Sequence, residues 1–326
     1  MTTASLRDTS ARTVKADAVV IGFTCAGESI TLATGAAHAR SVVEAWRGDL
    51  AATLMQLGAS AKPGDVCTLP SNGAVKAPLL VAVGLGTSED FSAETLRRAS
   101  GSAARSVAGK ATVAVALPCG TDEQVRAVVE GSLLGAYAYD DYLSKKQPPV
   151  TEVVVLTEQA RSKSAKVAAE EAVCVAAAVN FTRDLINRPP NDLYPESFAD
   201  EVAQRAKKSR VKVSVTSDEA LKAQGYGGIL GVGKGSARPP RLVTLSYKPS
   251  RPVAHLAFVG KGITFDSGGL SIKPSASMAT MKCDMSGAAA VAAATFAIAE
   301  LGLPVRVSAY ALPCREHARR ERDAPR

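Results

Sequence analysis

The chain has few of the residues that build the commonest zinc sites and disulfide frameworks. Only three of its 326 residues are histidine, and no His-Glu-x-x-His pair occurs, which argues against a three-histidine zinc centre. Its six cysteines include no C-x-x-C pair, so we expect reduced thiols that mostly fill core positions. Residues 1–15 contain no apolar stretch, and we therefore expect no secretory signal, no membrane span and a cytoplasmic protein.

Aromatic residues are also scarce, at 5% of the chain, although the formal net charge is +8. The basic residues are scattered, and the only tight groups are Lys207-Lys208-Ser209-Arg210 and the C-terminal tail. A nucleic-acid-binding face usually gathers basic residues on one surface. Nucleic acid is therefore not the expected partner, and DNA binding stays a minor alternative that a salt-dependent shift with duplex DNA would favour.

Short β-branched runs alternate with helical patterns along the first half of the chain, as is typical of an α/β fold. A long helical pattern from about Ser164 to Ile186 ends at Asn187-Arg188-Pro189-Pro190, and we expect this helix to link two domains. Further runs in the second half predict another sheet. The predicted strands are Ala18–Ile21, Pro78–Val83, Thr112–Leu117, Glu152–Leu156, Val211–Val215, Arg241–Tyr247, His255–Val259 and Val305–Leu312, and the predicted helices of the first half are Ser92–Ala108 and Asp122–Ser144.

The most informative stretch runs from Val259 to Val291 and places two lysines and two aspartates among glycines and apolar residues. The preceding strand puts Lys261 and Asp266 on the loop at its carboxyl end, where open α/β sheets bind ligands. Asp284 comes just before a helix that is apolar all round, reaches about Leu301 and must therefore be buried. Two carboxylates facing one sheet edge can bridge a pair of divalent cations.

Lysine can join such a site in two ways. Beside two dications the ammonium of Lys261 is disfavoured, so this residue can deprotonate and bind a cation. Lys273 lies farther along the loop and can stay charged, stabilising a developing oxyanion. Taken singly, each of these residues could be a solvated surface charge, and Asp284 could be a helix N-cap. Cys283 could add a soft metal contact, although core packing is favoured.

This stretch resembles the M17 leucine aminopeptidases, whose signature runs V-G-K-G-I-T-F-D-S-G-G-x-S-I-K-P, with M-K-x-D-M-x-G-A-A-A-V behind it. The likeness is nearly continuous from about Leu79 to Leu312. It includes the segments Glu130–Tyr137, Arg183–Asn191 and Gly231–Pro240.

The resemblance implies that Lys261, Asp266 and Asp284 bind metal and that Lys273 is the catalytic lysine. It also implies two divalent metal ions, Mn²⁺ or Zn²⁺, peptide substrates trimmed from their N-termini, and a homo-hexamer. The implied fold is an N-terminal α/β domain joined by a long helix to an incomplete C-terminal α/β metallopeptidase domain. We expect the N-terminal domain at 1–163, the linker helix and Pro-rich turn at 164–190, the catalytic domain at 191–312 and an aberrant basic tail at 313–326.

The family supplies its remaining ligands from a later Asn-Thr-Asp-Ala-Glu-Gly-Arg segment, which this sequence lacks. Asp266 alone would then serve one metal position, so we expect this chain to hydrolyse little or nothing, and the hexamer is in question. One codon choice for Cys314–Arg326, read from its second nucleotide, gives Ala-Glu-Asn-Met-Pro-Gly-Gly-Asn-Ala-Met-Arg-Pro-Gly, which is the family's pattern. We therefore hypothesise a frameshift near Pro313, testable by reading the gene onward for the missing segment.

Two alternatives complete the interpretation. The chain could be a catalytically dead product that acts as a binding or assembly partner through its first domain, in place of an aminopeptidase. The segment Gly228–Lys234 imitates a phosphate-binding loop, but Gly235 stands where Ser or Thr must ligate magnesium, so we set a nucleotide site aside.

Overall fold

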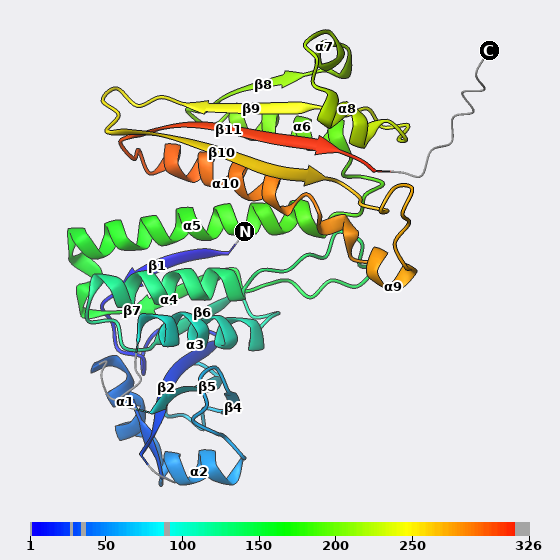
Figure 1. Cartoon of the computed structure of the whole chain (residues 1–326). Coiled ribbons are helices and arrows are strands. Elements are labelled where there is room, and N and C mark those ends of the chain that lie inside the picture. Colours follow the sequence, from blue (N-terminus) through cyan, green and yellow to red (C-terminus); the bar gives the residue numbers. More distant parts are fainter. Residues whose placement is uncertain (1, 27–28, 34–36, 88–91, 317–326) are drawn as a thin grey trace. The chain divides into compact units, whose positions relative to one another are not determined.

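The computed structural model describes residues 2–26, 29–33, 37–87 and 92–316, and divides into two compact units at Ala176 and Ala177. The division falls inside the long helix α5, Lys163–Asn187, which the sequence pattern predicts almost residue for residue. Each unit holds its own sheet, so the chain has a mixed α/β fold (Figure 1). In the described part of the chain, no helix combines the length and apolar character that crossing a membrane requires.

The first unit contains a mostly parallel sheet with strand order β1-β7-β6-β2-β5-β4. Strand β3 pairs antiparallel with the C-terminal end of β2. Helices α3 and α4 and the start of α5 supply the apolar side chains that cover one face, while α1 and α2 cover the other. The strands are β1 (Thr3–Arg7), β2 (Ala18–Ala26), β3 (Ser29–Leu32), β4 (Val66–Pro70), β5 (Leu79–Thr87), β6 (Thr112–Ala116) and β7 (Glu152–Leu156). The helices are α1 (Ala37–Ala45), α2 (Leu50–Gln56), α3 (Ala93–Ser106), α4 (Asp122–Gly135) and the 3-10 turn Glu158–Arg161.

Helix α4 ends at Gly135, nine residues before the predicted end at Ser144, so that boundary was wrong. Beyond Gly135 the side chains of Tyr142 and Leu143 are mostly exposed, and the segment has no apolar stripe to bury. A helix without such a stripe gains little from packing and does not persist. All six cysteines lie in the described residues and none forms a disulfide, as expected; Cys119, Cys174 and Cys314 are buried.

The second unit is built on a four-stranded sheet with order β10-β11-β9-β8, in which only β10 and β11 are parallel. One face of this sheet packs against α6, α10 and the end of α5 through a single apolar core. The strands are β8 (Lys212–Thr216), β9 (Leu242–Tyr247), β10 (Ala254–Ile263) and β11 (Val305–Cys314). The helices are α6 (Pro195–Ala206), α7 (Asp218–Ala223), α8 (Gly227–Gly233), α9 (Ser275–Met278), the 3-10 turn Met281–Cys283 and α10 (Ser286–Glu300).

Helix α10 is less buried than its composition suggests. Ala288, Ala292 and Phe296 face the core, but Ala290 and Ala294 are exposed, so the expectation of burial all round was wrong. Small alanine side chains leave little apolar area in water, which explains why this face is tolerated. The segment that imitates a phosphate-binding loop forms helix α8.

Candidate metal and catalytic site

The site lies where strand β10 ends, and it begins with a close approach of backbone to backbone. A Cβ on Gly260 would lie 2.5 Å from the carbonyl oxygen of Gly287, so only glycine lets the start of α10 pack directly on the strand. The amide of Ile263 also donates to the carbonyl of Asp284, at 3.2 Å. The two contacts fix Asp284, which precedes α10, beside the end of β10.

Lys261 and Asp284 form one half of the site. Strand β10 continues to Ile263, so Lys261 lies within the strand and not on the loop after it, because parallel pairing with β11 extends the strand. The Lys261 Nζ lies 3.2 Å from Asp284 Oδ2. This oxygen is buried and accepts no well-aligned hydrogen bond, and burial raises the pKa of the Asp284 carboxyl. An under-satisfied carboxylate oxygen beside an amine is a feature that a bound cation would relieve.

Asp266 and Lys273 form the other half. The loop after β10 turns through Gly268 and Gly269, whose φ angles of 86° and 63° lie in the left-handed region. The turn lets the Gly268 amide donate to Asp266 Oδ1 at 2.8 Å, and it returns the chain so that Lys273 Nζ donates to Asp266 Oδ2 at 2.9 Å. The bond to Asp266 raises the pKa of Lys273, so this lysine is an ammonium at neutral pH.

Glu316 is a further acidic residue at the site, and sequence reasoning missed it. Its carboxylate accepts a hydrogen bond from the Gly268 amide at 3.1 Å and lies against Asp266. Hydrogen bonding from Glu316, and then from Lys273 and Gly268, holds the pKa of Asp266 well below its usual range. The same contact with Asp266 raises the pKa of Glu316.

Strand β11 explains this placement. It extends through Pro313 and Cys314, two residues past the boundary expected for the catalytic domain, and delivers Glu316 to the same sheet edge as Asp266. The parallel register that pairs Ile263 with Cys314 brings Glu316 there, and no local sequence pattern marks it. Residues 317–326 of the expected basic tail lie outside the described residues.

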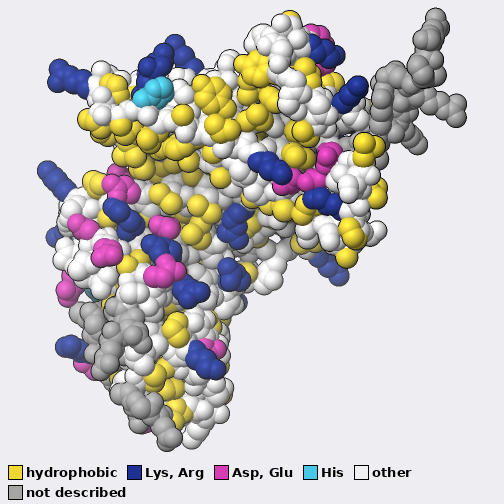
Figure 2. All heavy atoms as spheres, in the orientation of Figure 1, with side chains coloured by type: hydrophobic (Ala, Val, Ile, Leu, Met, Phe, Trp, Pro, Cys, Tyr) yellow, Lys and Arg dark blue, Asp and Glu magenta, His cyan; other side chains and the backbone are white. Residues whose placement is uncertain are grey.

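The structure therefore brings together all four residues that the sequence pattern singles out. Figure 2 shows acidic and basic side chains gathered where β10 and β11 end in Figure 1. The donor set of two carboxylates and one amine suits a hard or borderline divalent cation. Among the described residues, no group of three or more His, Cys, Asp or Glu has the arrangement of a complete metal site, so the fit is partial. Cys283 is half-buried in the turn before Asp284.

Comparison with known sequences also divides the chain into an N-terminal and a catalytic part. Residues 180–321 match the catalytic domain of the cytosol aminopeptidase family, and residues 20–146 match its N-terminal domain. A probable cytosol aminopeptidase of Streptomyces avermitilis is 48% identical over 324 residues, which cover 95% of this chain and 63% of that protein. One from Micrococcus luteus is 44% identical, over 90% of this chain and 59% of its own length. The chain thus spans less than two thirds of these relatives.

Solved structures show the same relationship. The bottromycin maturation enzyme BotP in complex with Mn is 34% identical, with a TM-score of 0.76 over 94% of this chain and 61% of that one. A mutant tomato leucine aminopeptidase superposes with a TM-score of 0.82 over 98% of this chain and 64% of its own. Its identity of 24% makes it evidence for the fold alone.

Proposed function

The chain belongs to the cytosol aminopeptidase family, and from that membership we propose that it is a metal-dependent aminopeptidase of leucine-aminopeptidase type. The proposed reaction is hydrolysis of the first peptide bond of a peptide with a free N-terminus. The proposal includes two divalent cations, Mn²⁺ or Zn²⁺, a cytoplasmic location and assembly as a homo-hexamer. Manganese is the cation found with the related BotP structure.

The convergence of Lys261, Asp266, Lys273 and Asp284 at the end of β10 supports this function most directly. In the proposed site, Lys261 as the neutral amine and the carboxylates of Asp266 and Asp284 donate to the cations. Divalent cations held there would polarise the substrate carbonyl and make water a better nucleophile at neutral pH.

Lys273 has a separate role in the proposal. Its ammonium is oriented by Asp266 at 2.9 Å and would donate hydrogen bonds to the oxygen on which negative charge develops. The bond to Asp266 raises the pKa of Lys273, which favours the protonated form of this donor. The backbone N–H of Gly268 donates a hydrogen bond to Asp266 Oδ1 at 2.8 Å, and this bond fixes the carboxylate that both binds metal and orients Lys273 in the proposal.

A manganese titration of the purified 326-residue chain, monitored by calorimetry, tests the proposed ligands. Asp266→Ala should lower the affinity for Mn²⁺ at least tenfold, since a carboxylate ligand is lost. Asp200→Ala is the matched control, because Asp200 is an exposed aspartate on α6 in the same unit. Lys273→Met should leave Mn²⁺ affinity undiminished, because this lysine is not a proposed ligand.

Hydrolysis of a chromogenic leucine amide is measured on the same samples. We expect little turnover from the described donor set, and any turnover should fall in both the Asp266 and the Lys273 variants. Absence of Mn²⁺ and Zn²⁺ uptake by the chain would contradict the proposal. Equal affinities in the Asp266 and Asp200 variants would contradict the ligand assignment.

A further inference from the structure

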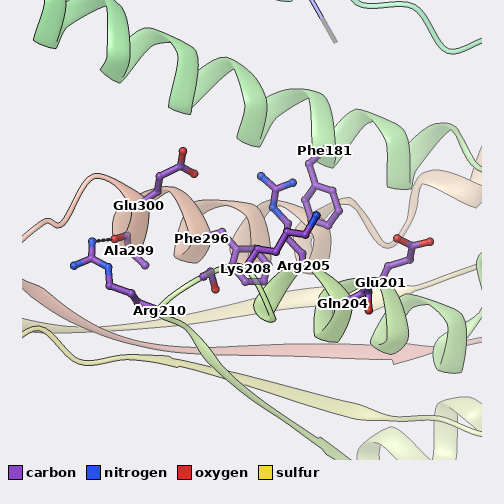
Figure 3. Close-up of a pocket in the computed structure, with 10 residues that line it drawn as sticks. Phe181, Glu201, Gln204, Arg205, Lys208, Arg210, Phe296, Ala299 and Glu300 are labelled. Carbon is purple, nitrogen blue, oxygen red and sulfur yellow. Dashed lines mark hydrogen bonds between the residues drawn. The ribbon is translucent and has the colours of Figure 1, made fainter.

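A groove of about 830 Å³ lies in the second unit between the end of α5, helix α6 and the end of α10 (Figure 3). Its volume is within the range of sites that hold small organic ligands. Half-buried Phe181 supplies aromatic surface, buried Phe296 packs behind it, and Arg205, Lys208 and Arg210 surround it with cationic groups. Phe296 is the first residue of α10 to line the groove and lies twelve residues after Asp284, a helical rise of about 18 Å from the candidate catalytic site.

Arg205, at the centre of the groove, packs against two aromatic rings and not against a carboxylate. The guanidinium of Arg205 lies 4.5 Å from the ring centre of Phe181 and 5.7 Å from that of Phe296. The two rings pack edge to face, with centroids 6.4 Å apart, so they form a fixed support. Within the described residues, neither Arg205 nor Lys208 forms an ion pair.

The groove carries an excess of positive charge. Glu201 is already engaged by Arg188, at 2.6 Å, so Glu300 is the carboxylate of the lining that is left to face the three cations. Two positive charges therefore lack a counterpart in the lining. The C-terminal end of a helix repels anions, but Arg210 donates to the Ala299 carbonyl there and offsets that effect (Figure 3).

We propose that this groove binds a small phosphate monoester, with the phosphate beside Arg205 and Lys208 and the organic group against Phe181. A phosphate monoester carries about −1.5 to −2 charge at pH 7, which matches the excess. The planar edge of Arg205 suits two phosphate oxygens, and Lys208 adds a compact charge. The apolar wall favours an ester over the bare ion.

Calorimetry on the full chain at fixed ionic strength tests the proposal with phenyl phosphate, inorganic phosphate and benzoate. Phenyl phosphate should bind at least threefold more tightly than either of the others, since it alone has both the dianion and the ring. Lys208→Glu should weaken phenyl phosphate binding at least tenfold, because it removes a charged partner and adds a repulsive one. Lys208 is exposed, so this variant should fold, which far-ultraviolet circular dichroism checks.

Lys207→Glu is the matched control, because Lys207 is an exposed neighbour of equal charge that does not line the groove. Its affinity should stay within twofold of the unmodified chain. Arg205→Lys keeps the charge but loses the planar edge, and should also weaken binding. Equal losses in the two glutamate variants, tighter binding of benzoate, or no saturable binding of phenyl phosphate would each overturn the proposal.

Discussion

Replacing Gly260 by alanine should disrupt the junction between β10 and α10, because the added methyl group would have no space. The new Cβ would lie 2.5 Å from the Gly287 oxygen, 2.6 Å from the Gly287 carbonyl carbon and 2.7 Å from the Ala288 Cα. Favourable carbon contacts need about 3.5–4.0 Å, so the start of α10 would have to move by about 1 Å. All three atoms belong to backbone, and no side-chain rotation relieves the clash.

The expected cost follows from two opposing effects. Overpacking a filled site destabilises by about 1–3 kcal/mol, and contacts with backbone favour the upper end. Alanine in place of glycine recovers about 0.5–1 kcal/mol by restricting the unfolded chain. We therefore expect a net loss of about 2 kcal/mol. Amide hydrogen exchange in β10 and α10, followed over a urea series, reports this local stability.

Gly231→Ala provides the matched control, because a Cβ there meets nothing within 4 Å and the residue lies in helix α8 of the same unit. This variant should gain about 0.5–1 kcal/mol. Gly260→Ala should also lower Mn²⁺ affinity, because a shift of α10 separates Asp284 from Lys261. If exchange in β10 and α10 is as slow in Gly260→Ala as in the unmodified chain, the close-packing argument is refuted.

Three further perturbations test other contacts. Gly131→Ala should destabilise the first unit by about 2–3 kcal/mol in urea unfolding, because its Cβ would lie 2.1 Å from the Arg97 carbonyl oxygen; a change under about 0.5 kcal/mol would contradict this. Hydrogen bonds from Ser60 lower the pKa of Asp65, so their stabilisation is complete above about pH 4 and lost as pH falls through the lowered pKa. Asp65→Asn should therefore cost about 0.5–1 kcal/mol at pH 7, a difference that shrinks by pH 3 in urea unfolding; an equal difference at both would refute the assignment. Val259 is 71% exposed on the edge strand β10, so Val259→Lys should reduce concentration-dependent self-association measured by light scattering, whereas unchanged association would exclude this edge.

The strands that carry apolar runs were predictable from sequence. Glu152–Leu156 has the bounds predicted from its four consecutive apolar residues, since a strand covered on both faces needs no polar alternation. Strand β1, Thr3–Arg7, was not predicted, because its ends are exposed and it is defined by backbone pairing with β7. Residue type alone carries little information about such an edge strand.

The candidate site was also predictable from the sequence only in part. Lys261, Asp266, Lys273 and Asp284 lie within 24 residues of sequence, so one glycine-rich pattern predicts their proximity. Glu316 is 50 residues beyond Asp266 and reaches it through the register of β10 with β11, a relationship that depends on the folded sheet. The groove around Arg205 likewise combines three helices. No local pattern in the sequence marks it.

The division of the chain inside α5 has a practical consequence for anyone who wishes to produce either unit alone. Cutting between Ala176 and Ala177 severs a continuous 25-residue helix and leaves newly unpaired amides on one fragment and carbonyls on the other. The first half of α5 would then pack on the first unit through an alanine stripe alone. The second half would pack on the second unit through Phe181 and Leu185. Fragments that overlap across the whole helix, with a new cap at each cut, are the better starting point.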